Sequence, residues 1–491
     1  MRKLALLVLI SGMLAACGGG GSGGSTPPTS PGGGPPPPGS TPSPVPSSHP
    51  TSTPVGPSPT PVATPTPFAT PTPSGGGITI LPDTTGRFGL TQIFDWDGVA
   101  SHAPMSASQI TSEAPHEDAV WGAFYPSTWN AAHPGMIVSR YMLPVEDDSM
   151  LSGHDLNWWQ TNHPDWILYA CKSDGTPTRD LAWTGTSFPD VPLDFSNPAV
   201  IQYQMNLLIP YMKENGYTAL AADNTDLLNY VKGGNPNFGE TPQAGEYGCG
   251  TYDSSGNFHR SFDGPLDSNS PADPAFVAAM VNWVKTVDAD VHAAGLKLLI
   301  NHPLYNPPTD PNEEQMIASV DGMVDENGYT RYGNFASGNT YAFTLEWIEY
   351  LQAHRVAVLV TDYFCLGSSC SNDVNSLSPQ QVDWALASYA IGNEGGEDMY
   401  TSPSGGQEYS YRSEYSTGYG APCSSYTQPA SYVYERKFQS ALVIVNATSS
   451  SYSFPLPSNH TYRDIEGQTL ANPLTMPPTS GYVLLTSNGC S

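Results

Sequence analysis

The segment Tyr217-Thr218-Ala219-Leu220-Ala221-Ala222-Asp223-Asn224 is a short apolar run that ends in two polar residues. Such a run, bounded by polar loop residues, is typical of a strand buried on both faces of a parallel sheet. Similar runs of apolar, β-branched or aromatic residues recur at 88–94, 120–125, 136–142, 166–170, 296–300, 322–324 and 356–360. The chain therefore predicts a series of buried strands with polar residues at their carboxyl ends.

Helical patterns lie between several of these runs, at 198–215, 272–294, 341–354 and 379–391. Strands that alternate with helices indicate parallel βαβ units. About eight strands without a Gly-rich dinucleotide or phosphate loop favour a (β/α)8 TIM barrel over an open doubly wound sheet. From about residue 433 the pattern changes to strands without helices, at 442–445, 452–456, 462–464 and 482–485. We expect an α/β fold with a barrel at 79–430, followed by a small antiparallel β-sandwich domain at 431–491.

The first residues look like an export signal. Arg2 and Lys3 precede the apolar run 4–14, which leads to Leu14-Ala15-Ala16-Cys17. This run is shorter than the roughly 20 residues that a spanning helix needs, and its ending resembles the bacterial lipobox. Residues 1–17 are thus interpreted as a lipoprotein signal peptide with Cys17 as the lipidation site. The alternative is an ordinary signal peptide with an incidental cysteine.

Residues 18–78 consist almost entirely of Pro, Gly, Ser and Thr. Such a segment has too few apolar side chains to offset the entropy of folding, so it is expected to be a disordered linker. The combination predicts a protein lipid-anchored to a bacterial membrane, at the cell envelope or extracellular face, and on the outer membrane in a Gram-negative cell.

The formal net charge of -28 argues against nucleic acid or anionic lipid as a partner, since both need clustered Lys and Arg. The membrane is then a partner only through the Cys17 anchor. The remaining cysteines are Cys171, Cys249, Cys365, Cys370, Cys423 and Cys490. In an oxidising compartment they predict up to three disulfides of undetermined pairing. Their spacing does not suggest zinc, and we expect neither a metal nor a cofactor.

Polar residues at the carboxyl ends of barrel strands are the candidates for chemistry. Five strand ends qualify: Asp95-Trp96-Asp97, Asp223-Asn224, Asn301-His302, Asp325-Glu326-Asn327 and Asp362-Tyr363. A ring of carboxylates with aromatic neighbours suits glycoside hydrolysis, in which one carboxylic acid protonates the leaving oxygen and a second carboxylate attacks or activates water. We expect Asp223 and Glu326 to be that catalytic pair. Each could instead cap a helix or pair with an arginine, and Asp325 replaces Glu326 if the strand register slips by one.

The other candidates are assigned to substrate binding. They are Asp95, Trp96, Asn224, Asn301, Tyr329 and Asp362. The aromatic rings of Tyr125, Trp158, Trp159 and Trp183 are further stacking candidates for sugars, although a single aromatic side chain more often belongs to the core.

Three segments in order, His163-Pro164-Asp165-Trp166-Ile167-Leu168, Leu193-Asp194-Phe195-Ser196-Asn197-Pro198 and Gly216 through Asn224, resemble the bacterial hypothetical glycosyl hydrolase family 15. The later segment Asp321-Gly322-Met323-Val324-Asp325-Glu326-Asn327 matches the strand-end Glu of that group. The group is distantly similar to the endo-α-1,4-polygalactosaminidase barrels. The resemblance implies a (β/α)8 hydrolase of glycosidic bonds, with Asp223 and Glu326 in the carboxylate roles.

The resulting hypothesis is a glycoside hydrolase that cleaves an extracellular or cell-envelope polysaccharide or oligosaccharide. The alternative is a lipid-anchored, non-catalytic carbohydrate-binding surface protein. An esterase or deacetylase is a weaker third option, because residues 79–491 contain no Gly-x-Ser-x-Gly nucleophile elbow. The sequence leaves open the sugar, the linkage, the stereochemical outcome, the roles within the carboxylate pair and the oligomeric state.

Overall fold

The computed structural model describes residues 104–186, 188–264, 273–330, 334–364, 376–394, 399–402 and 411–490, together with strand β1 (Phe94–Trp96). For β1, and for residues 400 and 402, only the backbone is described. The expected signal peptide, the lipidation site Cys17 and the linker 18–78 lie outside these residues.

Eight strands form one parallel sheet in the order β1-β2-β3-β6-β10-β11-β12-β13. After β1 they are β2 (Ala119–Trp121), β3 (Ile137–Met142), β6 (Ala219–Ala222), β10 (Lys297–Asn301), β11 (Gly322–Asp325), β12 (Ala357–Thr361) and β13 (Met399–Ser402). The first and last strands contact each other. No backbone ladder joins them in the described part of the chain, so the domain is TIM-barrel-like without a demonstrated closed ring.

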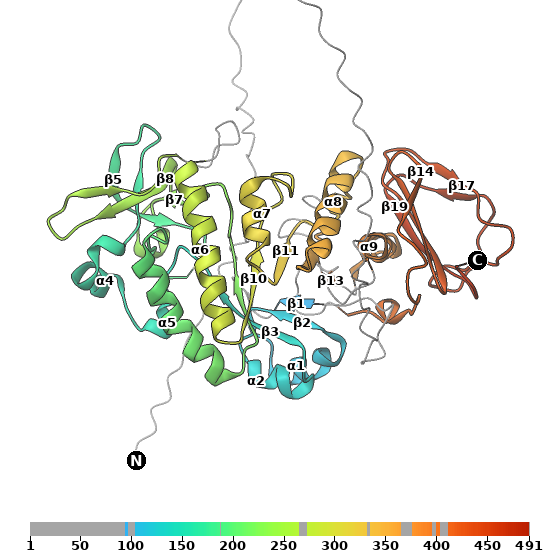
Figure 1. Ribbon diagram of the computed structural model, residues 1–491, viewed down its shortest axis with the longest axis horizontal. Coiled ribbons are helices and arrows are strands. Elements are labelled where there is room, and N and C mark those ends of the chain that lie inside the picture. The colour runs from blue at the N-terminus through green and yellow to red at the C-terminus, as the bar shows by residue number, and fades with distance from the viewer. Residues whose placement is uncertain are drawn as a thin grey trace, which may run out of the picture. The chain divides into compact units, whose positions relative to one another are not determined.

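Helices cover the outer face of this sheet: α1 (Ala107–Glu113), α2 (Pro126–Ala132), α5 (Pro198–Asn215), α6 (Pro274–Ala293), α7 (Pro311–Ile317), α8 (Asn339–Ala353) and α9 (Pro379–Gly392). The short helices α3 (Ser149–Ser152) and α4 (Leu156–Asn162) lie in the connection between β3 and β6, and α4 packs through Trp159 against a separate apolar cluster. Figure 1 shows α5, α6, α7 and α8 one after another along the sheet. Within the described residues, no helix is both long and apolar enough to cross a membrane.

The long helices begin where the sequence supplies caps. Asn197 caps α5 and Asp273 caps α6, each accepting a bond from a backbone N–H of the first turn, with proline at the following position. Ser378 and Gln381 form a capping box at the start of α9. These local signals explain why the predicted ends of the long helices agree with the observed ones to within two residues.

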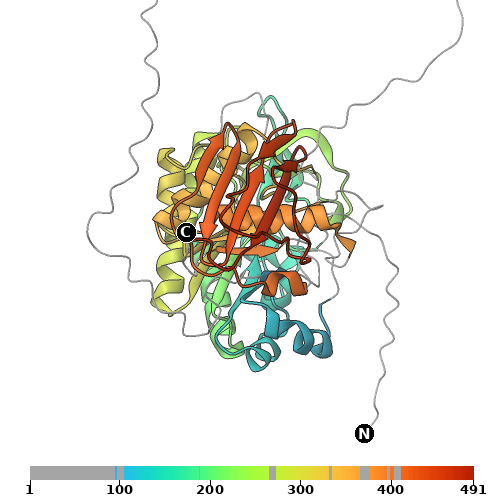
Figure 2. The ribbon, with the colours of Figure 1, turned by 90° about the vertical axis from the view of Figure 1, so that its right-hand side faces the viewer.

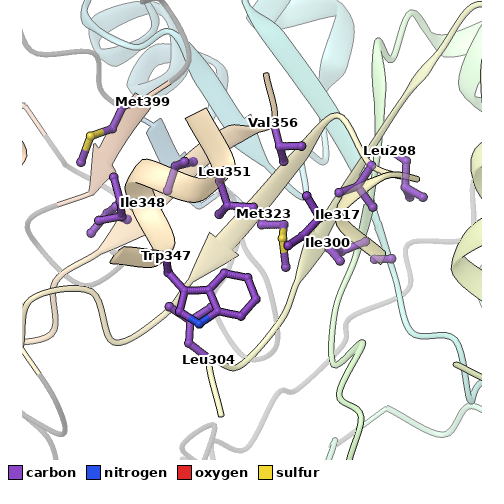
Figure 3. Close-up of a cluster of buried hydrophobic side chains, with 14 of the residues drawn as sticks. Leu298, Ile300, Leu304, Ile317, Met323, Trp347, Ile348, Leu351, Val356 and Met399 are labelled. Atoms are coloured by element: carbon purple, nitrogen blue, oxygen red, sulfur yellow. The ribbon is translucent and has the colours of Figure 1, made fainter. Parts of the chain in front are cut away.

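Alternation along the strands divides the core into two layers. Ala219, Ala221, Leu299, Val324 and Leu359 belong to a small cluster enclosed by the curled sheet. Their strand neighbours face outward into the larger core under the helices. Figure 3 shows this outer layer, where Leu298, Ile300 and Met323 lie near Ile317 of α7 and Trp347 and Leu351 of α8. Strand period therefore decides which strand-end residues point into the enclosed side.

A second sheet is inserted in the first half of the barrel. Its strands are β4 (Tyr169–Cys171), β5 (Pro177–Trp183), β7 (Lys232–Gly233), β8 (Gln243–Tyr252) and β9 (Phe258–Arg260), all paired antiparallel. The expectation that 166–170 supplies a barrel strand is wrong, because β4 pairs with β5 and β8 and is tied to β8 by the Cys171–Cys249 disulfide. The eighth strand of the main sheet is instead β13.

The C-terminal part is built of antiparallel sheets. One contains β14 (Thr427–Ala430), β15 (Val433–Phe438), β16 (Ala441–Asn446) and β19 (Ser480–Leu485), and the other pairs β17 (Tyr452–Phe454) with β18 (Leu474–Met476). Figure 2 faces this layer. A second disulfide joins Cys423 to Cys490, while Cys365 and Cys370 lie outside the described residues. The segment 462–464, expected as a strand, makes only isolated bridges at Arg463.

The C-terminal sheet packs on helix α9. Strands β16 and β19 lie against this helix, and Gly481 approaches Ala387 and the backbone of Asp383 so closely that a Cβ there would clash. The buried Arg436 donates to the carbonyl oxygens of Ile391 and Asn393 at the end of α9. The domain is therefore fixed to the barrel through packing and through bonds to the end of a helix.

Candidate active site

Three polar side chains continue the inner series of the strands at one rim of the sheet. Asp223 follows β6 directly, Asn301 ends β10, and Glu326 follows β11. In the register of the ladders, Ile300 pairs with Ala222 and Asn301 pairs with Val324. Asp223 therefore stands beside Asn301, and Glu326 follows the inward-facing Val324 by one strand period.

Asp223 is held by three donors. The Tyr141 hydroxyl donates to Oδ2 at 2.7 Å, and the Asn301 amide donates to Oδ1 at 2.7 Å. The backbone N–H of Asn224 also donates to Oδ1, at 2.9 Å. Asn224 adopts a left-handed conformation with φ 55°, which turns the chain away from the strand. The carboxyl is thus fixed by the ends of three adjacent strands.

Glu326 interacts with both of these residues. Burial, followed by the nearby charge of Asp223, raises the pKa of Glu326 to about 8, while a hydrogen bond from the Asn301 side chain opposes this rise. Burial also raises the pKa of Asp223, against the effect of its hydrogen-bond donors. The two carboxyls therefore form a coupled pair that resists double ionisation.

The hydrogen bonds indicate where a single shared proton resides. Tyr141, Asn301 and the Asn224 N–H all donate to Asp223, and donors stabilise the ionised form of a carboxyl. The pKa of Glu326 is raised to about 8, and only one such bond, from Asn301, opposes this rise. The donors therefore favour the ionised form at Asp223 and leave the protonated form favoured at Glu326.

Asp325 faces the opposite side of its strand. Its neighbour Met323, two residues earlier, belongs to the outer core, and Asp325 is 5% exposed. Its Oδ1 accepts the backbone N–H of Asn327 at 3.1 Å. The register thus favours Glu326 over Asp325 as the residue that faces Asp223.

Sequence reasoning missed three residues near this pair. Tyr141 was overlooked, although its alternation with Arg140 on β3 places it on the inner side. Glu146 lies in the loop after β3, where burial and the charges of Asp190 and Asp223 raise its pKa to about 8 against hydrogen bonds from Thr184 and Thr186. The Tyr230 hydroxyl is buried and feels the charges of Glu146 and Asp223. No local pattern marks a loop residue such as Glu146.

The residues assigned to substrate binding separate into groups. Asn301 and Asn224 lie beside Asp223. Asp362 is 1% exposed, and its Oδ1 accepts the Tyr329 backbone N–H at 2.7 Å, so it supports the loop that follows Glu326. Burial and, to a smaller extent, the charge of Asp325 raise the pKa of Asp362 to about 7, although the hydrogen bond from Tyr329 opposes this rise. The side chains of Asp95 and Trp96 lie outside the described part of the structure.

Tyr329 does not lie at a surface that could receive a sugar. Its side chain is fully buried, with its ring centroid 4.9 Å from that of Tyr341. The backbone carbonyl of Tyr329 accepts a bond from the Trp384 indole at 3.1 Å. The prediction that Tyr329 binds substrate is corrected to a core position, because the loop after β11 turns its ring back under helices α8 and α9.

The other aromatic candidates differ in exposure. Trp159 is fully buried and donates from Nε1 to Asp147, so it is a core residue. Trp158 is partly exposed and stacks on His154, with ring centroids 3.5 Å apart. Trp183 is also partly exposed, and Tyr125 is 48% exposed.

A cavity of about 540 Å³ lies behind strand β3, between that strand and helix α5. Its lining is mainly apolar and includes Phe124, Met142 and Leu208. It shares Tyr141 and Glu146 with the surroundings of Asp223, but Asp223, Asn301 and Glu326 do not line it. The cavity is therefore distinct from the inner rim that holds the carboxyl pair.

Where the structure describes the chain, no cluster of three or more His, Cys, Asp or Glu side chains has a geometry suited to a metal ion. The rim instead offers one carboxyl whose pKa is raised to about 8, a second carboxyl held by three hydrogen-bond donors, and an amide between them. This combination can donate a proton to one atom and place a negative charge beside another.

No protein-family model and no curated protein sequence matches this chain. Similar solved structures include the maltogenic alpha-amylase AmyB from Thermotoga neapolitana, with 11% identity, 81% of this chain and 98% of that chain covered, and a TM-score of 0.40. The alpha-amylase from Geobacillus thermoleovorans, complexed with acarbose, has 10% identity, 81% and 98% coverage, and a TM-score of 0.43. A GH31 family sulfoquinovosidase from E. rectale has 11% identity, 81% and 62% coverage, and a TM-score of 0.40. These structural neighbours are glycoside hydrolases, but TM-scores at this level transfer neither residue roles nor substrates.

Proposed function

We propose that this protein is a glycoside hydrolase that cleaves glycosidic bonds of an extracellular or cell-envelope polysaccharide. Asp223 is the nucleophile or general base, and Glu326 is the general acid. The observation that carries the proposal is the pair itself: two carboxyls on the inner rim with Asn301 between them, of which Asp223 accepts three hydrogen bonds while burial raises the pKa of Glu326 to about 8. Glycoside hydrolysis needs one protonated and one ionised carboxyl on either side of the scissile bond.

The local environment supports this division of roles. A general acid works best when its pKa lies near the working pH, and burial has brought Glu326 to about 8. The donors from Tyr141, Asn301 and Asn224 orient the Asp223 carboxylate, which is positioned by rigid strand ends rather than by a long loop. Asn301 and Asn224 are the proposed contacts for sugar hydroxyls, and Asp95 and Trp96 remain candidates from the sequence.

We further propose that the enzyme works outside the cytoplasm, tethered through a lipid on Cys17. The Leu-Ala-Ala-Cys ending of the apolar leader and the Pro-rich segment 18–78 support this location. The disulfides Cys171–Cys249 and Cys423–Cys490 are consistent with an oxidising compartment. A long tether suits a polymeric substrate that cannot diffuse to the membrane surface.

The test is release of reducing ends from bacterial and plant polysaccharides by the full chain, compared with the Asp223→Asn and Glu326→Gln variants. Both variants are expected to lose at least about 100-fold in rate while their circular dichroism spectra stay unchanged. Asp165→Asn is the surface control, because Asp165 is exposed on the 3-10 turn Pro164–Trp166.

Binding of a polysaccharide without release of reducing ends, equal in the wild type and both variants, would replace this proposal. The protein would then be a lipid-anchored carbohydrate-binding protein.

A further inference from the structure

The next residue after Asn301, His302, lies in a fully buried polar network. Its ring is 1% exposed. Its Nδ1 lies 2.8 Å from the carbonyl oxygen of Thr225, and its Nε2 lies 2.7 Å from Oε2 of Glu313. Thr225 follows Asp223 by two residues, and Glu313 belongs to helix α7. His302 thus connects the end of β10 with the segment that carries Asp223 and with an outer helix.

The two contacts of His302 constrain its charge. A carbonyl oxygen accepts a hydrogen bond but cannot donate one, so Nδ1 must carry a proton. Nε2 and Oε2 of Glu313 are 2.7 Å apart, although the direction of the ring N–H is not that of a hydrogen bond. At this distance the lone pair of a neutral ring would face the carboxylate oxygen, whereas a protonated ring forms a close ion pair with it.

The groups around the pair favour the charged form. Asn306 donates to the other oxygen of Glu313 at 2.9 Å, which stabilises a carboxylate. Burial lowers the pKa of His302, but Glu313, the Thr225 carbonyl and the charge of Asp226 together outweigh it and raise that pKa overall. Asp226 lies in the segment after β6, Glu313 on α7, and the Trp347 ring of α8 packs near the imidazole at 6.3 Å.

A second pair of bonds crosses the same two strand ends. The backbone N–H of Thr225 donates to the Asn301 carbonyl at 3.0 Å, and its hydroxyl donates to that same oxygen at 2.7 Å. Thr225 and the Asn301–His302 pair therefore hold each other reciprocally: the Thr225 carbonyl accepts from the His302 ring, and the Asn301 carbonyl accepts from Thr225. These bonds fix the two strand ends that carry Asp223 and Asn301, whose side chains contact each other.

We propose that His302 is a cationic positioning residue that, paired with Glu313, locks the end of β6 to the end of β10 and so fixes Asp223 against Asn301. It does not touch the substrate. The expected effect of His302 on catalysis rests on the function proposed above, whereas the expected charge of its ring does not depend on that function.

The charge is tested first, by 15N NMR of the full chain labelled in its histidine rings. The His302 signals are assigned by their loss in His302→Gln. Both ring nitrogens are expected to remain protonated at about pH 8, where an ordinary histidine with a pKa of about 6.5 is neutral. In Glu313→Gln the ring is expected to lose its second proton at least about one pH unit lower than in the wild type. A neutral ring protonated only at Nδ1 at about pH 6 in the wild type would overturn the proposal, whether or not the protein has any activity.

The positioning role is tested by kinetics on a polysaccharide that the wild type cleaves. His302→Gln and Glu313→Gln are expected to lower kcat by about 10- to 100-fold and to change KM by less than about 3-fold, because they misplace a catalytic group without removing a substrate contact. His292→Gln is the matched control, since His292 also contacts two carboxylates, Asp288 and Asp321, but is about half exposed and distant in sequence from both catalytic residues.

Folding of each variant is checked by near-UV circular dichroism, and kinetics are measured well below its unfolding temperature. A folded His302→Gln variant with unchanged kcat would contradict the positioning role while leaving the glycosidase assignment intact. Absence of hydrolysis in the wild type would instead contradict the proposed function, and the NMR result would still decide the charge.

Discussion

The amide of Asn301 contacts both carboxyls of the pair. It donates to Asp223 at 2.7 Å, and its hydrogen bond to Glu326 lowers the pKa of that residue. Asn301 ends strand β10, which lies between β6 and β11, the two strands that carry the carboxyls. One side chain on the central strand therefore contacts both carboxyls and opposes the effect of burial on the pKa of Glu326.

Replacement of Asn301 by alanine is expected to lower kcat/KM by about 10- to 100-fold, because Asp223 loses one of its orienting donors. The pKa of Glu326 should rise further when the opposing bond is lost, so the alkaline limb of the pH–rate profile should move to higher pH. Kinetics across pH, with the exposed Asn157→Ala as a control, check both effects. An alkaline limb that moves to lower pH would show that Asn301 does not act on Glu326.

Under the proposed function, the wild-type protein is expected to have a bell-shaped dependence of kcat/KM on pH. Activity should fall as pH rises through about 8, where Glu326 loses the proton that it donates. It should also fall on the acidic side, at a pH above the ordinary Asp value, because burial raises the pKa of Asp223. A Glu326→Gln variant with residual activity should lack the alkaline limb, and retention of that limb would assign it to another group.

Loss of the Tyr141 hydroxyl should move the acidic limb of the dependence of kcat/KM on pH. Tyr141→Phe removes the 2.7 Å bond to Asp223 Oδ2, which favours the ionised carboxyl. The pKa of Asp223 should therefore rise, and the acidic limb should move to higher pH, with little loss of stability. The exposed Tyr125→Phe provides the control. An unchanged acidic limb in Tyr141→Phe would mean that this limb does not report Asp223.

Stability should decrease between mildly acidic and mildly alkaline pH. The folded state raises the pKa of Glu146 from 4.5 to about 8, so it binds the proton more tightly than the unfolded chain. The stabilisation is complete below about pH 4.5 and is lost as pH rises through about 8. Thermal melts should therefore give a Tm several degrees lower at about pH 8 than at about pH 5.

Glu146→Gln tests the source of that decrease. Its amide oxygen can still accept from Thr184 and Thr186, and it does not ionise. The Tm of the variant should fall less than that of the wild type across the same pH interval. The exposed Glu214→Gln variant is the control and should behave like the wild type. An equal loss in Glu146→Gln would exclude Glu146 as a contributor.

The Asn301 amide, which contacts both carboxyls, also limits the distance between them and so predicts the stereochemistry of hydrolysis. Two oxygens that accept from one amide group lie within roughly 6 Å of each other, which is the short separation that accompanies a covalent intermediate. Hydrolysis is therefore expected to retain the anomeric configuration. Proton NMR of the product formed first would show the same anomer as the substrate, and the opposite anomer would indicate an inverting mechanism.

The sequence predicted those features that depend on local pattern. The alternation along 217–224, 296–302 and 322–327 identifies buried parallel strands and the polar residues at their ends. The same alternation on β3 would have placed Tyr141 on the inner side. Pairing between distant segments was not predictable: the run at 166–170 is as apolar as a barrel strand but finds its partners in β5 and β8.

The positions of loop residues were equally hidden from the sequence. Tyr329 follows Glu326 by three residues, yet the turn at Gly328, with φ 47°, sends its ring into the core. Glu146 and Glu313 approach the rim from a loop and from an outer helix. Such contacts depend on tertiary packing rather than on the period of a strand.

The most direct test of the carboxylate pair compares two substrates of one enzyme: a polysaccharide and an aryl glycoside of the same sugar with a leaving group that needs no protonation. Glu326→Gln should lose at least about 100-fold in kcat on the polysaccharide and much less on the aryl glycoside, whereas Asp223→Asn should lose activity on both. Asp325→Asn, on the opposite face of the strand, should not show this difference between substrates. Equal losses on both substrates in Glu326→Gln, or the selective loss in Asp325→Asn, would contradict the assignment of Glu326 as the acid opposite Asp223.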